Sequence, residues 1–168
     1  MHSTSPSDRA RELAGYKILN TPPEQAYDNI TELASKIFDC PIALIVLLDE
    51  HRQWYRSRVG MDVSENPLDH AFCTHTILEP DMLVVPDATQ DARFAENPFV
   101  TSGPQIRFYA GVPLVSPRGI ALGSLCVIDR KPHQINEAQA EFLRTLGREV
   151  IELFERRHQR ETPPADPA

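Results

Sequence analysis

The stretch Pro41-Ile42-Ala43-Leu44-Ile45-Val46-Leu47-Leu48-Asp49 decides the architecture of this chain. Its uninterrupted apolar run lies between a proline and an aspartate, and its length and β-branched content are typical of a strand buried on both faces. After a turn at Glu50-His51, residues 53–59 alternate as in a half-exposed strand, with Trp54 and Arg56 on one face. The two segments predict a β-hairpin, and Trp54 is expected to pack under a helix.

A second hairpin is expected later in the chain. Residues 108–115 and 121–128 are apolar segments joined by a turn at residues 116–119 that contains proline and glycine. A shorter strand is expected at residues 82–85. Between this strand and the second hairpin, residues 87–105 are rich in Asp, Asn, Pro and Gly. A long irregular segment inside a compact domain is usually functional.

Two long helices are expected to flank these strands. Apolar residues of the segment 24–38 recur at three-and-four spacing, and Pro23 suits the first turn of such a helix. Residues 135–157 form the longest predicted helix, with Asn136 as its N-cap. Two shorter helices are expected at residues 9–13 and, begun by Asp69, at residues 68–78.

The order of these segments predicts an α+β fold in which helices pack on an antiparallel sheet. It does not match the alternating strands and helices of a doubly wound nucleotide-binding sheet. The length of 168 residues suits one compact domain. We expect an N-terminal arm at residues 1–22 that is partly disordered or a short helix, the domain itself at residues 23–158, and a disordered proline-rich tail at residues 159–168.

Charge and cysteine content narrow the class of function. The chain has 17 basic and 24 acidic residues, a net charge of -7, which favours solubility and disfavours binding to nucleic-acid phosphates. Its apolar runs are shorter than the roughly 18–20 residues of a membrane span, and the N-terminus lacks the pattern of a signal peptide. Cys40, Cys73 and Cys126 are widely spaced and odd in number, which indicates a reducing compartment. We therefore expect a cytoplasmic protein that binds neither nucleic acid nor membranes.

Several segments between about Tyr27 and Phe154 carry a family likeness, in the family's own order. They are residues 41–49 and 52–60 of the first hairpin, Ala71-Phe72-Cys73-Thr74-His75-Thr76-Ile77, Leu83-Val84-Val85-Pro86-Asp87-Ala88-Thr89-Gln90-Asp91, Arg93-Phe94-Ala95-Glu96-Asn97-Pro98, and residues 106–114 and 123–129 of the second hairpin. Together they resemble the GAF domains, the small-molecule-binding sensor domains of bacterial signalling proteins.

The resemblance implies a GAF-like (profilin-like) central antiparallel sheet of about five or six strands. It places the terminal helices on one face and the ligand-pocket loops and short helices, from about Gly60 to Gln105, on the other. Family members bind small ligands such as cyclic nucleotides, bilins, haem or amino-acid-like effectors on that second face. They commonly dimerise through terminal helices that continue into a kinase or cyclase. The sequence leaves open whether the chain is a stand-alone regulator or a fragment of a larger protein.

The candidate ligand-binding residues lie in the segments expected to cover that pocket. An arginine facing the pocket could bind an anionic ligand with its planar fork of donors, although Asp and Arg side chains could equally fix a long loop to the sheet. Aromatic residues could line the pocket, although apolar residues at this spacing are often simple core. The candidates are Phe72, Cys73, His75, Asp87, Asp91, Arg93, Phe94, Arg107 and Tyr109.

Cys73 and His75 suggest metal, haem or redox chemistry, but the sequence offers little support for it. A zinc site needs three or four convergent ligands, and no second Cys/His pair has suitable spacing, so we expect no metal site. Free methionine-sulfoxide reductases of the GAF family carry a cysteine just before the strand 107–114, where residues 102–106 offer none. The Cys-His pair that attaches bilins in phytochrome-like domains is absent as well. We expect no catalytic residue and no enzymatic activity, and the sequence does not identify a cofactor.

The sequence thus favours a regulatory sensor module that binds an unidentified small ligand or a partner and transmits through its terminal helices. The apolar stripe Leu143, Leu146, Val150, Leu153 and Phe154 favours a homodimer through these helices. A downstream signalling protein such as a kinase or cyclase is the expected partner. The alternatives are a small redox enzyme of the free methionine-sulfoxide reductase type using Cys73, and a ligand-free protein-interaction domain.

Overall fold

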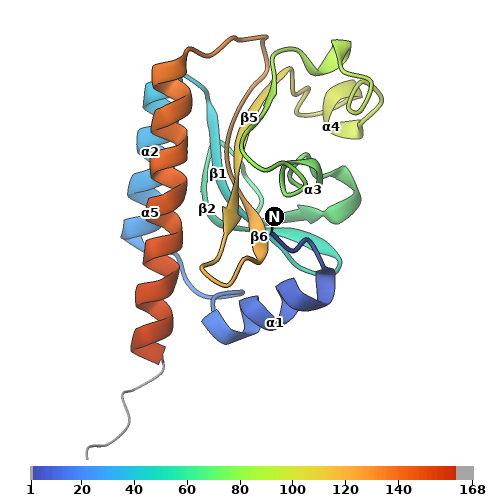
Figure 1. The fold of residues 1–168 in the computed structure, drawn as a ribbon. Coiled ribbons are helices and arrows are strands. Elements are labelled where there is room, and N and C mark those ends of the chain that lie inside the picture. The colour runs from blue at the N-terminus through green and yellow to red at the C-terminus, as the bar shows by residue number, and fades with distance from the viewer. Residues whose placement is uncertain (1, 162–168) are drawn as a thin grey trace, which may run out of the picture.

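The computed structural model describes residues 2–161, and within them a six-stranded antiparallel sheet forms the centre of the molecule (Figure 1). The spatial order of the strands is β3-β2-β1-β6-β5-β4, so the two hairpins predicted from the sequence meet at β1 and β6. The strands are β1 (Ile42–Leu48), β2 (Arg52–Val59), β3 (Glu65–Pro67), β4 (Leu83–Val85), β5 (Phe108–Val115) and β6 (Ala121–Asp129).

Helices cover both faces of the sheet (Figure 1). On one face, here the helix face, α2 (Gln25–Phe38) and α5 (Glu137–Glu161) lie side by side. On the other, here the loop face, lie α3 (Cys73–Thr76), α4 (Pro98–Thr101) and the 3-10 turns η1 (Leu68–His70) and η2 (Ala88–Gln90). The helix α1 (Pro6–Tyr16) crosses the lower end of the sheet. This confirms the predicted α+β fold, with terminal helices on one face and residues 60–105 on the other.

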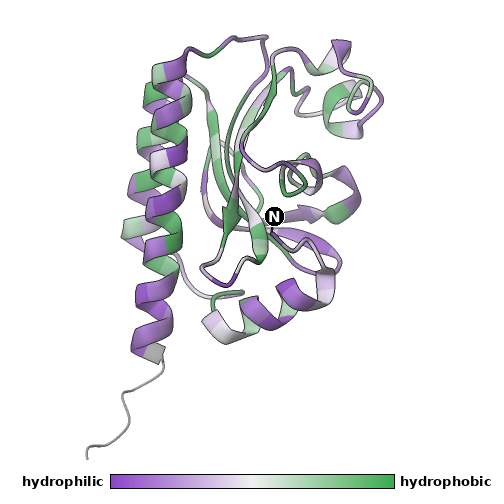
Figure 2. Cartoon of the chain, viewed as in Figure 1, coloured by the Kyte–Doolittle hydropathy of each residue, from purple (hydrophilic) through white to green (hydrophobic). Residues whose placement is uncertain are grey.

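The alternation of β1 explains why the sheet needs cover on both sides. Ala43, Ile45 and Leu47 belong to the core of the helix face, and the intervening residues of the same strand belong to the core of the loop face. Figure 2 shows the strands as largely hydrophobic and the C-terminal turns of α5 as largely hydrophilic. Trp54 joins the core of the helix face, as predicted, and Tyr55 that of the loop face.

The helix α5 is held to the sheet by its apolar side. Leu143, Val150 and Phe154 are fully buried, and burial of such side chains contributes roughly 1.5–3 kcal/mol each. Asn136 caps the helix as predicted, because its side-chain oxygen accepts a hydrogen bond from the Gln139 amide at 2.8 Å. Among the described residues, no helix is both long and apolar enough to span a bilayer.

The structure differs from the sequence prediction in several short elements. The short helix predicted at residues 68–78 is present only as the four residues of α3, because the extended backbone at Ala71 separates η1 from α3, and Asp69 caps neither. The first helix runs from Pro6 to Tyr16 rather than over residues 9–13, since the Ser5 side chain caps its start. Neither β3 nor α4 was predicted. Residues 159–161 of the predicted tail continue α5, and residues 162–168 lie outside the described residues.

Candidate functional site

A small cavity lies beneath the cover of the loop face. We call it the loop-face cavity, and its volume is about 20 Å³, which suffices for about one water molecule. Strands supply its floor and the short helices with their flanking loops supply its cover. The lining residues are Leu44, Val46, Gln53, Tyr55, Met61, Phe72, Cys73, Phe99, Ile106, Tyr109, Cys126 and Ile128. Any ligand larger than a water molecule therefore requires the cover to move.

A buried chain of hydroxyl groups lies next to this cavity. The Tyr109 hydroxyl is 2.7 Å from that of Thr76 in the cover and 3.4 Å from that of Ser124 in the sheet. Burial raises the pKa of Tyr109, so its phenol stays neutral and hydrogen-bonded. Gly111 makes room for the ring, because a β-carbon there would lie 2.4 Å from the Tyr109 oxygen. This chain of hydrogen bonds joins α3 to the centre of the sheet.

Stacked aromatic rings form the cover above the cavity. The rings of Phe72 and Phe94 are parallel, with centroids 4.1 Å apart, and Phe72 also lies 5.2 Å from the ring of Tyr109. His75 meets the Phe94 ring edge-on at 4.8 Å, and the Arg93 guanidinium lies over the same ring at 5.3 Å. Burial and the nearby Arg93 lower the pKa of His75, so its imidazole is neutral at neutral pH.

The predicted site residues fall into three groups in the structure. Phe72, Cys73 and Tyr109 line the loop-face cavity, and Phe94 supports them from behind. His75, Arg93 and Asp91 lie outside Phe94, where Arg93 donates to both carboxylate oxygens of Asp91. Asp87 and Arg107 do not line the cavity. Asp87 accepts from the Thr89 amide, and Arg107 donates to the Val100 carbonyl at 2.9 Å, so both fix loops.

Sequence reasoning missed several residues of the cavity. Tyr55 enters from β2, Cys126 from β6, Phe99 from α4 and Met61 from the loop after β2. The period of two along β2 could have assigned Tyr55 to the loop face once the face of Trp54 was known, whereas Cys126 also required the register between β1 and β6. Met61 and Phe99 follow no such period, because Met61 lies in a loop and Phe99 in the four-residue helix α4.

Two thiols lie at the cavity, and neither is set up for redox chemistry. Burial raises the pKa of Cys73 to about 12, outweighing the opposite effects of Ser124 and Arg9. Burial also raises the pKa of Cys126, with Cys73 as the next cause. Since the thiolate is the nucleophile, both side chains are expected to be unreactive in the folded protein.

We therefore expect slow thiol labelling at neutral pH. Native protein should react with a thiol reagent at least about 100-fold more slowly than protein in urea, because the thiols are both buried and protonated. The time course of labelling, followed by mass spectrometry, measures this. Rapid labelling of Cys73 in the native state, or consumption of methionine sulfoxide that a Cys73→Ser variant loses, contradicts the prediction.

A larger hollow, of about 640 Å³, runs along β2 and α2, away from the predicted site. Arg56 is one of its lining residues; it is buried, and its guanidinium carbon lies 5.1 Å from the ring centroids of both Tyr27 and Trp54. The guanidinium donates to the Thr21 hydroxyl and the Pro22 carbonyl. Because oxygen atoms of the chain itself accept from these donors, Arg56 holds the segment before α2 against the sheet. These donors are not available to a ligand.

Family comparison agrees with this architecture. The GAF domain model matches residues 22–151, which is most of the chain. The chain belongs to the GAF domain family. GAF domains are sensor domains found in signalling proteins.

One curated relative is a cyclic di-GMP phosphodiesterase of Pseudomonas aeruginosa, 45% identical over 115 residues. The match covers 68% of this chain and 20% of that enzyme, so the chain spans about a fifth of its relative's length.

Solved GAF-fold structures share the architecture at low sequence identity. A GAF domain of an Acinetobacter phosphoenolpyruvate-protein phosphotransferase is 20% identical, with a TM-score of 0.67 over 95% of this chain and 97% of that one. The free methionine-R-sulfoxide reductase of Neisseria meningitidis is 17% identical, with a TM-score of 0.64 over 96% and 100%. The PixJ GAF domain of Thermosynechococcus elongatus is 15% identical, with a TM-score of 0.63 over 89% and 90%. At these identities the likeness shows the fold alone.

Proposed function

We propose that this GAF domain is a regulatory module of a cyclic di-GMP signalling protein. Its input is a small ligand or partner that acts on the cover of the loop-face cavity, and its output is a change in the pose of α5. The observation that carries this proposal is a nearly filled cavity whose cover is joined, through the N-terminal arm, to the long C-terminal helix. The 45% identical segment of the P. aeruginosa phosphodiesterase supports the cyclic di-GMP context.

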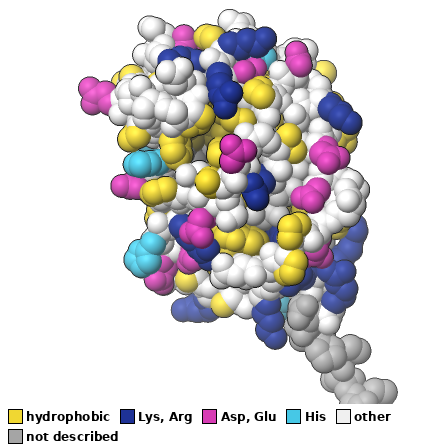
Figure 3. All heavy atoms as spheres, turned by 180° about the vertical axis from the view of Figure 1, so that it is seen from behind, with side chains coloured by type: hydrophobic (Ala, Val, Ile, Leu, Met, Phe, Trp, Pro, Cys, Tyr) yellow, Lys and Arg dark blue, Asp and Glu magenta, His cyan; other side chains and the backbone are white. Residues whose placement is uncertain are grey.

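The described residues support regulation rather than catalysis. Hydrolysis of phosphodiesters commonly uses metal-bound water held by several carboxylates. Among residues 2–161, the one group of His, Cys, Asp and Glu side chains compact enough for a metal contains a single carboxylate. Figure 3 shows acidic and basic side chains interspersed over the face turned away from the view of Figure 1, which favours a small ligand or a protein partner over a nucleic-acid backbone.

Residues 2–16 of the N-terminal arm contact both ends of the proposed path. Near the cover, the His2 imidazole donates to the carbonyl of Ile77, directly after α3, at 2.6 Å. Ser3 then pairs with the turn between β5 and β6, and α1 follows. At the end of α1, the ring of Tyr16 packs 5.7 Å from that of Phe154 in α5. A displacement of the cover can thus reach α5 through a continuous set of contacts.

Arg118, in the turn between β5 and β6, joins α1 to α5 directly. Its guanidinium donates to the carboxylates of Glu12 in α1 and Glu155 in α5, each at 2.8 Å, and to the Tyr16 hydroxyl at 2.8 Å. The Arg118 side chain is 47% exposed, so solvent weakens each pair. Together with Tyr16, these contacts form a network that is expected to stabilise the folded state by about 1 kcal/mol.

Loss of this network is expected to loosen both helices. In an Arg118→Ala variant, amides of α1 and of the last turns of α5 should exchange roughly fivefold faster, the equivalent of about 1 kcal/mol. Amides of α3 should also exchange faster, because the N-terminal arm contacts the end of α3. Hydrogen exchange by mass spectrometry measures this, with Arg148→Ala as the matched control, since Arg148 is 65% exposed and pairs within α5 alone. A change confined to the β5–β6 turn counts against the proposed path.

The small volume of the cavity favours a second candidate, a protein-interaction domain whose pocket its own side chains fill. The two candidates differ in ligand binding. Native mass spectrometry and thermal unfolding of the full chain with cyclic di-GMP, cyclic AMP and cyclic GMP separate them. A bound nucleotide that raises Tm supports the sensor, whereas binding of a protein partner with no co-purified small molecule supports the interaction domain.

We also infer a cytoplasmic homodimer through the terminal helices. The residues available for its interface differ from those expected from the sequence. Leu143, Leu146, Val150 and Phe154 of the apolar stripe pack inside the chain and are not free for a partner. The interface then rests on the apolar residues left accessible, such as Leu33 on α2, which is 42% exposed. Analytical ultracentrifugation over a range of protein concentrations tests this, and a strict monomer contradicts it.

A further inference from the structure

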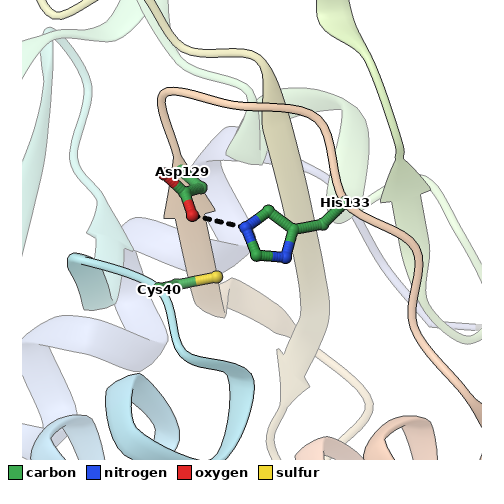
Figure 4. A group of neighbouring side chains, drawn as sticks. All are labelled: Cys40, Asp129 and His133. Carbon is green, nitrogen blue, oxygen red and sulfur yellow. Dashed lines mark hydrogen bonds and ion pairs between the residues drawn. The ribbon is translucent and has the colours of Figure 1, made fainter.

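Three potential metal ligands from distant parts of the sequence converge at one end of the sheet. Cys40 precedes β1, Asp129 ends β6, and His133 lies in the connection to α5. One ligand atom from each residue lies within 4.8 Å of the other two. Figure 4 shows the sulfur, the carboxylate and the imidazole pointing toward one another. None of the three belongs to the lining of the loop-face cavity.

Each of these side chains is held in place by its surroundings. One carboxylate oxygen of Asp129 accepts from the Arg130 amide at 2.6 Å, and the other faces the Nε2 atom of His133. The His133 ring packs 5.0 Å from that of Phe108, and its amide donates to the Pro86 carbonyl at 3.2 Å. Cys40 is buried, and its thiol donates weakly to a carbonyl 3.5 Å away. The set is therefore pre-organised by backbone and packing contacts.

We propose that Cys40, Asp129 and His133 form a binding site for a divalent transition-metal ion, with Zn²⁺ as the preferred occupant. Thiolate and imidazole are ligands that zinc prefers, and a carboxylate completes a set of three. Bond lengths of roughly 2.0–2.3 Å place tetrahedral donors about 3.4 Å apart. Donors within 4.8 Å reach that spacing by small side-chain rotations.

The binding step balances in charge and protons. The Cys40 thiol loses its proton to solvent as the sulfur–metal bond forms, and the His133 imidazole gives up its contact with Asp129 to coordinate through an unprotonated ring nitrogen. A thiolate and a carboxylate then neutralise the two positive charges of the ion. The His133 side chain is 19% exposed, so solvent can reach the site and supply water as a fourth ligand.

A bound ion would add a crosslink between three segments that already meet through strand pairing, a side-chain hydrogen bond and packing. It would tie the end of α2 and the start of β1 to the end of β6 and to residues 130–136, which lead into α5. Occupancy is therefore expected to stiffen the start of α5, at the opposite end of that helix from Arg118 and Glu155. This gives the domain a second input, independent of the loop-face cavity.

The test uses the full chain, stripped with a chelator and then titrated with Zn²⁺ or Co²⁺ alone. We expect one equivalent of metal, a higher Tm, and with Co²⁺ a thiolate-to-metal charge-transfer band. Cys40→Ser and His133→Gln should each weaken the affinity more than about 10-fold. Cys73→Ser is the matched control and should keep the affinity, the band and the stoichiometry.

His133→Gln addresses the risk that a buried substitution unfolds the protein. Residue 133 is only partly buried, and glutamine can still donate to Asp129, so the metal-free variant should keep its circular dichroism spectrum and Tm. Equal affinity of the wild type and His133→Gln, or a cobalt spectrum without the thiolate band, overturns the proposal. In that case Asp129 and His133 form a structural pair and Cys40 is a core residue.

Discussion

Replacing Gly123 with alanine is expected to destabilise the domain by at least about 3 kcal/mol. A β-carbon at Gly123 would lie 1.8 Å from the Val46 carbonyl oxygen and 3.0 Å from the Cα atom of Leu47. Both contacts are backbone atoms of β1, which pairs with β6 at the centre of the sheet. The clash cannot be relieved by a side-chain rotation, so the two central strands must separate locally.

Thermal and urea unfolding followed by circular dichroism measure this effect. For a chain of this length, a loss of about 3 kcal/mol lowers Tm by roughly 6–12 °C. Gly15→Ala is the matched control, because nothing lies within 4 Å of a β-carbon there and alanine favours a helix by about 1 kcal/mol. The explanation fails if the two variants have the same stability.

The second large effect is expected for Phe72→Ala, at about 3–5 kcal/mol. The substitution removes the parallel stack on Phe94 at 4.1 Å and the contact with Tyr109 at 5.2 Å. It also enlarges the loop-face cavity beyond its volume of about 20 Å³. An enlarged apolar cavity binds small apolar molecules, so benzene should raise the Tm of this variant and leave that of the wild type unchanged.

Phe99→Ala is the control for this prediction. Phe99 also lines the cavity, but it is only partly buried and its ring contact is with His70 at 5.2 Å, toward the outside. We expect roughly half the loss of unfolding free energy, measured by urea titration at constant m-value. A loss below about 1 kcal/mol for Phe72→Ala would show that the aromatic stack does not hold the cover in place.

Periodicity predicted the sheet and its two faces well, because local spacing determines which side of a strand a residue occupies. The run 42–48 and the alternation around Trp54 were sufficient to predict the first hairpin, and the apolar segments 108–115 and 121–128 predicted the second. The same information did not distinguish Phe108 from Tyr109. The structure places Phe108 on the helix face and Tyr109 at the loop-face cavity. The short elements in residues 60–105 were harder to predict, since their shape depends on packing over the sheet.

The proposed metal ligands show the limit of spacing arguments most clearly. Cys40 and His133 are far apart in the sequence, so no local Cys/His pattern marks them, and the sequence predicted no metal site. The pairing of Ile42 with Ile128 brings the start of β1 beside the end of β6, and with it Cys40 beside Asp129. Strand order, which the hairpins alone do not determine, creates this group.

The packing of α1 also bears on how this domain can be cut out of a longer chain. The family match begins at residue 22, yet Leu13, Tyr16 and Ile18 are at most 2% exposed and belong to the core of the helix face. A fragment that starts at the family boundary uncovers the ring of Phe154 and the apolar end of the sheet. Such a fragment is expected to aggregate, and a protease that removes residues 2–21 would inactivate the domain by unfolding rather than by trimming it.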